Sequence, residues 1–357
     1  MAQLQRIVLA GGGTAGHIEP ALNTADAFRR HFPQVQITMI GTQRGLEARL
    51  VPERGYELAL IPAVPMPRKL GKDLVAVGPR VRAAIRAAQD IVHGSDLVVG
   101  FGGYVALPVY LAARREGVPI VIHEANAKPG LANRVGAKFT SFVAESVPGS
   151  IAKATLTGIP LRRNIATLDR AANREQARAF FGFASDRPTL LVFGGSQGAQ
   201  HLNEVVARGL DALLEAGVDV LHSVGERNSL PAAQPGYVPL PYLDRMDLAY
   251  CAADFAMCRA GAMTCAELAA VGLPAFYVPL PIGNGEQRLN ALPVVQAGGG
   301  KIIDDAALTA DWLVTNATEL ANDPERVQAM SRAASAYGVR NADEALVSLA
   351  MRALEGR

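Results

Sequence analysis

Residues 6–16 read RIVLAGGGTAG, and His17 follows them directly. The apolar run Ile7–Ala10 predicts a buried parallel strand, and the glycines behind it have the G-x-G-x-x-G spacing of a dinucleotide-binding turn. Such a strand and turn are typical of a doubly wound α/β domain that holds a phosphate-bearing ligand at the end of its first strand. The spacing leaves open whether that ligand is a nicotinamide or flavin cofactor or another phosphate compound.

The composition is that of a well-buried globular protein. The chain has 357 residues, half of them apolar and 19% charged, so two domains of ordinary size are expected. A net charge of +2 gives no global argument for a nucleic-acid partner. Cys251, Cys258 and Cys265 form no C-x-x-C pair, and we expect small buried hydrophobes in a reducing compartment rather than metal ligands or disulfides.

Neither a leader nor a membrane span is expected. A strand that starts at residue 6 leaves no room for a signal peptide, which favours a cytosolic location. The uncharged run 97–113 contains Gly100, Gly102, Gly103 and Pro108, so it predicts a strand, a turn and a helix.

Short apolar segments alternate with helix-length segments, which predicts parallel α/β architecture. In the first half the expected strands are 6–10, 36–41, 57–61, 97–100, 119–123 and 141–144. In the second half they are 189–193, 218–223, 254–258, 274–279 and 301–303. The polar stretch 161–167 lies between the halves and is the expected linker.

A weak internal repeat supports this division. IVLAGGGTAGH at 7–17 and LLVFGGSQGAQ at 190–200 each contain a strand, a glycine pair, a hydroxyl residue and a further glycine before a helix. Two doubly wound sheets, each with a glycine turn after its first strand, would hold ligands at the carboxyl ends of their strands.

The sequence argues against a nicotinamide site. An acidic residue about 20 residues past the turn usually holds the ribose, but the second strand ends in IGTQR at 40–44. A better ribose candidate is Glu267 in RAGAMTCAE (259–267), which follows a strand and opens a helix whose amides could receive phosphate. Thr264 and Glu267 also have the spacing of a capping box, so both interpretations stay open at this point.

Seven motifs together resemble one family of bacterial glycosyltransferases. They are GGGTAGH (11–17), GFGGY (100–104), HEAN (123–126), GIPLR (158–162), GGSQG (194–198), RAGAMTCAE (259–267) and EQRLNAL (286–292). That family has the two-domain GT-B fold and transfers N-acetylglucosamine from UDP-N-acetylglucosamine to lipid I, which yields lipid II for peptidoglycan. The resemblance covers nearly the whole chain, with one visible departure: Ala15 stands where many members have glycine.

The resemblance implies two Rossmann-like domains that face each other across a cleft. Residues 1–162 would bind the acceptor and face the membrane, and a C-terminal helix at about 340–357 would pack back on them. Residues 163–339 would bind the UDP-sugar.

The resemblance also assigns site residues by motif. Glu267 matches the ribose-binding acid, and the helix-start contacts to phosphate and sugar match Ala262, Met263 and Thr264, with Cys265 and Ala266 beside them. Leu243 matches the residue whose backbone contacts the uracil. The other assigned positions are Ser196 and Arg162 near the diphosphate, Gln287 and Asn126 at the sugar hydroxyls, and Thr14, Ala15 and Gly16 in the first glycine turn.

The implied reaction displaces UDP from the anomeric carbon by the 4-hydroxyl of the N-acetylmuramoyl unit, with inversion. His17 directly follows the first glycine turn, and histidine titrates near pH 6.5 in model peptides, so it is the candidate base or the group that orients the acceptor. The alternative is a structural histidine that hydrogen-bonds the turn. Glu124 is the rival base, and its alternative roles are to position the acceptor or to support Asn126. The chain has no Asp-x-Asp motif, so we expect no cofactor or tightly held metal, loosely associated magnesium aside, and stabilisation of the leaving diphosphate by oriented donors.

Because lipid I is a membrane substrate, the resemblance implies a membrane contact, which it places near residue 70. Apolar residues recur at helical spacing from Leu74 to Val92, and basic residues surround the first half of this stripe. From Ile85 onward we expect the stripe to face the core. The expected lipid contacts are Arg68, Lys69, Lys72, Leu74 and Val75.

The implied partners are UDP-N-acetylglucosamine, lipid I, the anionic inner leaflet at the cytoplasmic face of the cell membrane, and other cell-wall synthesis proteins. Three alternatives remain. A GT-B transferase with a soluble acceptor would lack lipid-dependent activity, an NAD-dependent oxidoreductase would bind NADH, and a non-catalytic sugar-nucleotide binding protein would show no turnover.

Overall fold

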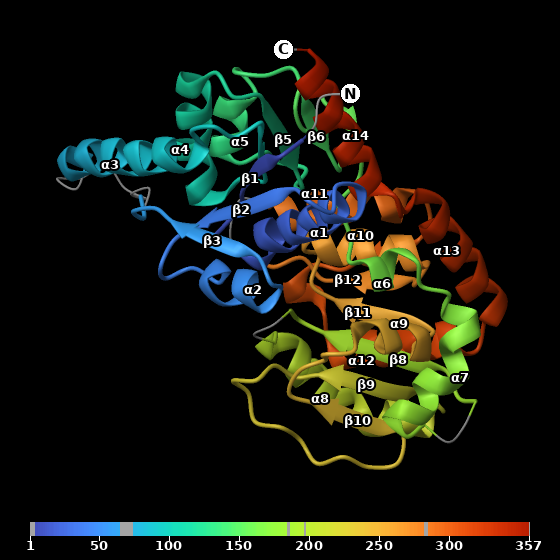
Figure 1. Ribbon diagram of the computed structural model, residues 1–357. Coiled ribbons are helices and arrows are strands. Elements are labelled where there is room, and N and C mark those ends of the chain that lie inside the picture. The colour runs from blue at the N-terminus through green and yellow to red at the C-terminus, as the bar shows by residue number, and fades with distance from the viewer. Residues whose placement is uncertain (1–3, 65–73, 184–185, 196–197, 282–284, 357) are drawn as a thin grey trace. The chain divides into compact units, whose positions relative to one another are not determined.

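The computed structural model describes residues 4–64, 74–183, 186–195, 198–281 and 285–356 (Figure 1). The chain forms two compact units. The first unit comprises Met1–Arg162 and Asn341–Arg357, and the second comprises Arg163–Arg340.

The first unit contains a seven-stranded parallel sheet in the order β3-β2-β1-β4-β5-β6-β7. Its strands are β1 Arg6–Ala10, β2 Gln36–Gly41, β3 Glu57–Leu60, β4 Leu97–Gly100, β5 Ile120–Glu124, β6 Val143–Glu145 and β7 Thr155–Leu156. Its helices are α1 Ala15–His31, α2 Glu47–Glu53, α3 Leu74–Val92, α4 Gly103–Glu116, α5 Leu131–Gly136 and α14 Ala342–Glu355.

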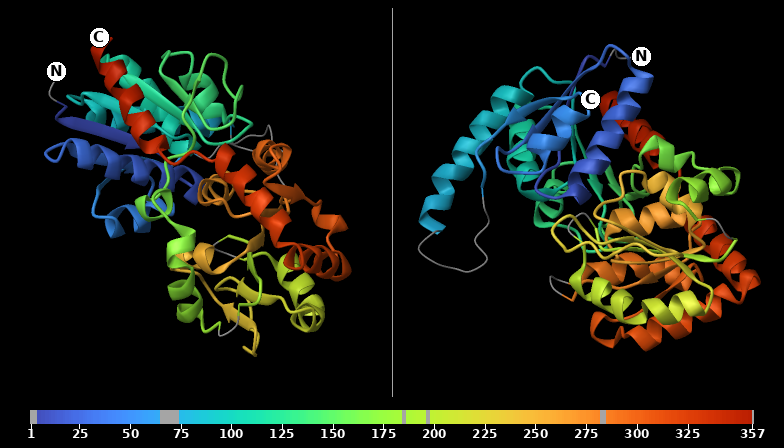
Figure 2. Two further views of the ribbon diagram at one scale, coloured as in Figure 1. Left: turned by 90° about the vertical axis from the view of Figure 1, so that its right-hand side faces the viewer. Right: turned by 90° about the horizontal axis from the view of Figure 1, so that it is seen from below.

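Helices cover both faces of this sheet (Figures 1 and 2). One core joins the sheet to α1 and α14 through residues such as Leu9, Phe28 and Leu346. The other core joins it to α3, α4 and α5 through residues such as Val8 and Val109. Because both faces are buried, the central strands are continuously apolar, as parallel strands require.

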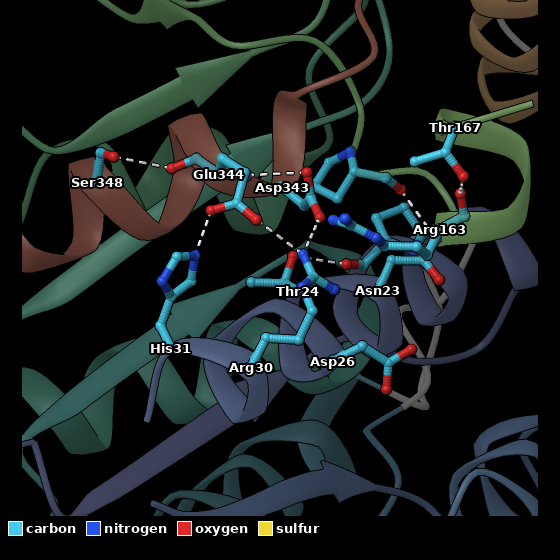
Figure 3. A network of polar contacts seen from close by, with 12 residues as sticks. Asn23, Thr24, Asp26, Arg30, His31, Arg163, Thr167, Asp343, Glu344 and Ser348 are labelled. Carbon is cyan, nitrogen blue, oxygen red and sulfur yellow. Dashed lines mark hydrogen bonds and ion pairs between the residues drawn. The ribbon is translucent and has the colours of Figure 1, made fainter. Parts of the chain in front are cut away.

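Polar contacts join the last helix, α14, to the first, α1, although the two are far apart in the sequence. Arg30, near the end of α1, donates to the carboxylates of Asp343 and Glu344 in the first turn of α14, and His31 pairs with Glu344 (Figure 3). These acids also suit the helix start, where the peptide dipoles favour negative charge. The polar contacts therefore fix the position of α14 along the helix that it packs against.

The second unit contains a six-stranded parallel sheet in the order β10-β9-β8-β11-β12-β13. Its strands are β8 Thr189–Phe193, β9 Asp219–Ser223, β10 Tyr237–Leu240, β11 Phe255–Cys258, β12 Ala275–Tyr277 and β13 Gly300–Ile302. Its helices are α6 Arg163–Ala166, α7 Arg170–Phe181, α8 Gln200–Glu215, α9 Met246–Ala252, α10 Ala262–Val271, α11 Glu286–Gln296, η1 Asp305–Ala307, α12 Ala310–Ala321 and α13 Pro324–Tyr337. One core packs α8 and α12 on the strands through Val206, Leu313 and Phe276.

The expected strands are confirmed, most of them within one or two residues at each end, and the run 97–113 forms β4 and α4 as predicted. The short strands β7 and β10 were missed. The expected linker 161–167 is not an uncovered stretch, because α6 forms within it and Ile165 is fully buried. The three cysteines are free and buried as predicted. Among the described residues, no helix is long and apolar enough to span a bilayer.

Candidate active site

The motifs of the first unit meet at the carboxyl ends of adjacent strands. The glycine turn 11–16 follows β1, the GFGGY motif begins at the last residue of β4, and HEAN includes the end of β5. A Cβ atom on Gly103 would lie 2.4 Å from the carbonyl oxygen of Gly12, so the first two loops touch. Strands β1 and β4 are neighbours from which the chain proceeds in opposite directions across the sheet, and ligands bind at such a switch point.

The first glycine turn leads into helix α1. Gly13 has φ +88°, which a residue with a side chain rarely adopts, and Thr14 is the extended N-cap residue. Ala15 is the first residue of the helix, and no positive φ is recorded for it. The departure from glycine at position 15 therefore causes no backbone strain, and Thr14, Ala15 and Gly16 stand together at the helix start.

His17 lies in the first turn of α1, half-buried beside the GFGGY loop. Its Nδ1 is 3.0 Å from Oγ1 of Thr14. Burial lowers the pKa of the imidazole below 6.5, although a backbone hydrogen bond with Gly12 opposes this by favouring the protonated ring. The ring is therefore mainly neutral at pH 7, as a general base must be.

Glu124 holds the loop that follows β5. Its Oε1 accepts from the backbone N–H of Asn126 at 2.9 Å, and its Oε2 accepts from Gly130 N at 3.1 Å and Asn133 Nδ2 at 2.9 Å. Burial raises the pKa of this carboxyl group, while these hydrogen bonds lower it. The arrangement favours the supporting role for Glu124, because its donors come from the loop that carries Asn126 and from α5, which follows that loop.

Sequence reasoning missed one acid at this site, Glu47. It is fully buried at the start of α2, and its Oε2 accepts from Gly13 N at 3.0 Å. The amide of the first turn thus binds an internal carboxylate, which is unfavourable for a dinucleotide diphosphate at the same point. A ribose-binding acid is expected at the end of β2, and Glu47 stands a few residues beyond that point.

The second unit repeats the switch-point arrangement with β8 and β11. The turn after β8 contains Gly194, Gly195 and Gly198, and β11 leads into α10. Gly261 is the N-cap residue of α10, so Thr264 lies inside the helix and the capping-box interpretation of Thr264 and Glu267 is wrong. Ala262, Met263, Thr264 and Ala266 are half-buried around the helix start, whereas Cys265 is buried.

Glu267 is 8% exposed and has a specific partner. Its Oε2 accepts from the hydroxyl of Tyr250 at 2.7 Å, and Tyr250 is fully buried in α9. Sequence reasoning missed Tyr250, since a lone tyrosine in an apolar helix carries no signal of a partner. A buried hydroxyl bound to the carboxylate restricts the rotamer of Glu267.

Gln287 connects two loops of the same unit. Its Oε1 accepts from Ala260 N at 3.2 Å, before α10, and from Leu280 N at 2.9 Å, after β12. Leu243 is buried between β10 and α9, and Arg162 is half-buried at the end of the first unit. The remaining predicted positions, Ser196 and the basic residues Arg68, Lys69 and Lys72, lie outside the described residues, as do the side chains of Leu74 and Val75.

Within α3 the expectation for the second half of the apolar stripe is confirmed. Ile85, Ala88 and Val92 are buried, and Arg80, Arg82 and Arg86 are exposed.

With this geometry established, the comparisons with known proteins define the class. The model of the glycosyltransferase family 28 N-terminal domain matches residues 7–145, and that of the C-terminal domain matches residues 189–346. The chain therefore belongs to glycosyltransferase family 28, and it is an α/β protein of the GT-B type.

Individual relatives are similar over most of their length. A Streptomyces avermitilis protein named UDP-N-acetylglucosamine–N-acetylmuramyl-(pentapeptide) pyrophosphoryl-undecaprenol N-acetylglucosamine transferase is 61% identical over 98% of this chain and 99% of its own. A Mycolicibacterium smegmatis protein of the same name is 57% identical over 97% and 93%. The crystal structure of Acinetobacter baumannii MurG matches with TM-score 0.78 and 29% identity over 98% of this chain and 99% of that one.

Proposed function

We propose that this protein transfers N-acetylglucosamine from UDP-N-acetylglucosamine to lipid I and so forms lipid II. The observation that carries this conclusion is 61% identity, over 98% of the chain, to a transferase named for that donor and acceptor. The oxidoreductase alternative loses its support, because the one dinucleotide-like turn binds the carboxylate of Glu47.

The second unit is the proposed donor site. Helix α10 presents its first backbone N–H groups at Ala262, Met263 and Thr264, where the helix dipole favours a diphosphate. Glu267, held by Tyr250, would accept both hydroxyls of the ribose. Leu243, Ser196 and Gln287 keep the roles that the resemblance implies, at the uracil, the diphosphate and the sugar hydroxyls. Arg162 and Asn126, which belong to the first unit, keep theirs at the diphosphate and the sugar hydroxyls.

The first unit is the proposed acceptor site, with His17 as base. The 4-hydroxyl oxygen of the acceptor forms a bond to the anomeric carbon, and its proton passes to the neutral imidazole. The bond between that carbon and the phosphate oxygen breaks, and its electron pair leaves with UDP. Attack opposite the leaving group inverts the configuration.

Stabilisation of the leaving diphosphate is assigned to protein donors. Backbone N–H groups aimed at developing charge in a water-poor site lower the barrier without reorganising. The absence of an Asp-x-Asp motif from the sequence supports this assignment, and we propose that transfer needs no tightly held metal.

Lipid I lies in the bilayer, so the enzyme must reach a membrane surface. We place the contact at Arg68, Lys69, Lys72, Leu74 and Val75, just before and within the start of α3. The exposed Arg80, Arg82 and Arg86 continue the positive charge along that helix, which supports docking on an anionic inner leaflet.

One experiment separates these functions. The protein is incubated with labelled UDP-N-acetylglucosamine and a short-chain lipid I analogue, and thermal unfolding is followed in parallel with UDP-N-acetylglucosamine, UDP-glucose and NADH. We expect labelled lipid II and a stabilisation of about 2.7 kcal/mol when the preferred donor is at about 100 times its dissociation constant. Stabilisation by NADH alone, without transfer, would refute the proposed function.

A further inference from the structure

The carboxylate of Glu47 joins three elements of the first unit. Its Oε1 accepts from the backbone N–H of Thr42 at 2.9 Å and from the Thr42 hydroxyl at 3.0 Å. Its Oε2 accepts from Gly13 N at 3.0 Å. The side chain therefore connects α2, the end of β2 and the first glycine turn.

The backbone around the Glu47 side chain contains three glycines that approach it closely. A Cβ atom on Gly45 would lie 2.0 Å from its Oε2, one on Gly41 would lie 2.3 Å from its Cγ, and one on Gly12 would lie 2.9 Å from its Oε1. Three glycines thus leave the space that the buried carboxylate fills. Burial raises the pKa of Glu47, but the hydrogen bonds outweigh it and hold the pKa below its usual value, so the group is charged.

The turn that Glu47 holds is also the turn that orients His17. The Gly12 carbonyl group and the imidazole lie side by side, because a Cβ atom on Gly103 would be 2.4 Å from Gly12 O and 3.4 Å from His17 Nδ1. The same Nδ1 lies 3.0 Å from Thr14 Oγ1. Gly12 and Gly13 share a peptide group, and the N–H of that group donates to Glu47. Rotation of this peptide would break the bond to the carboxylate and move the carbonyl group that meets the imidazole.

We infer that Glu47 is a positioning residue for the transfer reaction. Its carboxylate fixes the peptide between Gly12 and Gly13 and, through it, the ring of His17. This inference rests on the proposed role of His17 as base. Misplacement of a reacting group by about 1 Å can cost about 100-fold in rate, so a fixed turn contributes to catalysis without touching the substrate.

The first unit offers a matched control in Glu145. This acid is also buried, and it accepts from Gly149 N at 2.8 Å, Ile151 N at 3.0 Å and Ser150 Oγ at 2.9 Å. It holds the loop after β6, away from the first glycine turn. Glu145→Gln therefore changes a buried acid that, like Glu47, accepts three hydrogen bonds, and it leaves the first glycine turn unchanged.

The test compares Glu47→Gln, Glu145→Gln, His17→Ala and the double variant of Glu47→Gln with His17→Ala. We expect Glu47→Gln to lower kcat with a soluble lipid I analogue by about tenfold or more, because the turn no longer holds one geometry. Its dissociation constant for UDP-N-acetylglucosamine should stay within about twofold, and the acid limb of its pH–rate profile should shift. In the His17→Ala background the same change should add little.

Thr42→Val gives a milder second variant in case Glu47→Gln folds poorly. It removes one hydrogen bond to the carboxylate and keeps the backbone, and we expect about a threefold loss of kcat. Glu145→Gln should lower the melting temperature comparably to Glu47→Gln yet leave kcat within about twofold.

Two results would overturn the inference. One is an unchanged kcat and pH profile in both Glu47→Gln and Thr42→Val. The other is an equal factor of loss from Glu47→Gln with and without His17. If His17→Ala itself retained full turnover while the wild type made lipid II, the role of His17 would fall separately and the transferase function would stand.

Discussion

The two glycine turns of this protein look alike in sequence and differ in what they bind. In the first, the N–H of Gly13 donates to the buried carboxylate of Glu47. In the second, Gly198 N donates to Gly195 O at 2.9 Å, and a Cβ atom on Gly198 would lie 2.1 Å from the carbonyl oxygen of Val224. The first turn is thus held by a negative charge, whereas the described contacts of the second are with neutral groups.

This difference shows why a glycine pattern does not define a ligand. Glycines permit a sharp turn and a close approach, but the group that approaches is supplied by another part of the fold. A carboxylate under the first turn disfavours an added diphosphate there. The second unit, with helix α10 beside its turn, is the better place for the sugar nucleotide.

The largest expected effect is on turnover, and it tests whether His17, which follows the first glycine turn, acts as the base. His17→Ala should lower turnover by about 10²–10⁴-fold, because general-base catalysis contributes that much, and donor affinity should be nearly unchanged. Steady-state kinetics with a soluble lipid I analogue and a donor-binding titration check both parts. A loss below about tenfold, beside a larger loss in Glu124→Gln, would move the base role to Glu124.

The next effect concerns the membrane contact, which we assign to the first unit alone. Replacement of Arg68, Lys69 and Lys72 by Gln should weaken binding to anionic vesicles by about 1 kcal/mol for each residue. Sedimentation measures this, and the difference should be largest at low salt, since the attraction is screened over about 8–10 Å. Turnover of a water-soluble lipid I analogue serves as control and should not change. Equal sedimentation of variant and wild type would contradict the assignment.

At the second unit, Glu267→Gln should weaken UDP-N-acetylglucosamine binding by about 1.5–3 kcal/mol, because hydrogen bonds from sugar hydroxyls to a charged acceptor are lost. Isothermal titration measures the donor dissociation constant directly. The expected loss is confined to the donor, with the acceptor KM unchanged. A normal donor dissociation constant in Glu267→Gln would remove the ribose-binding role.

Tyr250→Phe should weaken donor binding less than Glu267→Gln, by about tenfold or less, since it frees the rotamer of Glu267 and keeps the charge. Tyr277→Phe is the matched control, because Tyr277 is also fully buried in this unit and its hydroxyl has no hydrogen-bond partner among the described residues. Equal donor affinity in the two tyrosine variants would show that the hydroxyl of Tyr250 does not position Glu267.

The smallest expected effect is on the free energy of unfolding, and it is expected in both units because each contains a buried histidine. Burial lowers the pKa of His123 in β5 and of His222 in β9 to about 4. Because the unfolded chain binds these protons near pH 6.5, the free energy of unfolding should fall as the pH drops from about 6.5 to 4, by about 1 kcal/mol for each histidine at pH 5.5. Urea unfolding at pH 7.5 and 5.5 measures this. His222→Gln should show a smaller fall than wild type, and an equal fall would contradict the assignment.

Much of the fold was predictable because its signals are local. Each central strand is a short apolar run that ends in a glycine or polar turn, and the start of α10 follows directly from the strand before it. The edge strands were harder to predict, since β7 consists of two exposed residues and β10 includes a proline. In the candidate site, His17, Asn126 and Glu267 were predicted from their motifs.

The sequence by itself therefore determined the order of strands, turns and helices along the chain. It also determined the family to which their motifs belong. Tertiary structure decided which side chains act on those turns. Glu47 reaches Gly13, Tyr250 reaches Glu267, and α14 returns to Arg30 from more than 300 residues away. These pairs depend on how separate elements pack, and local periodicity carries no information about a partner that only packing brings within hydrogen-bond distance.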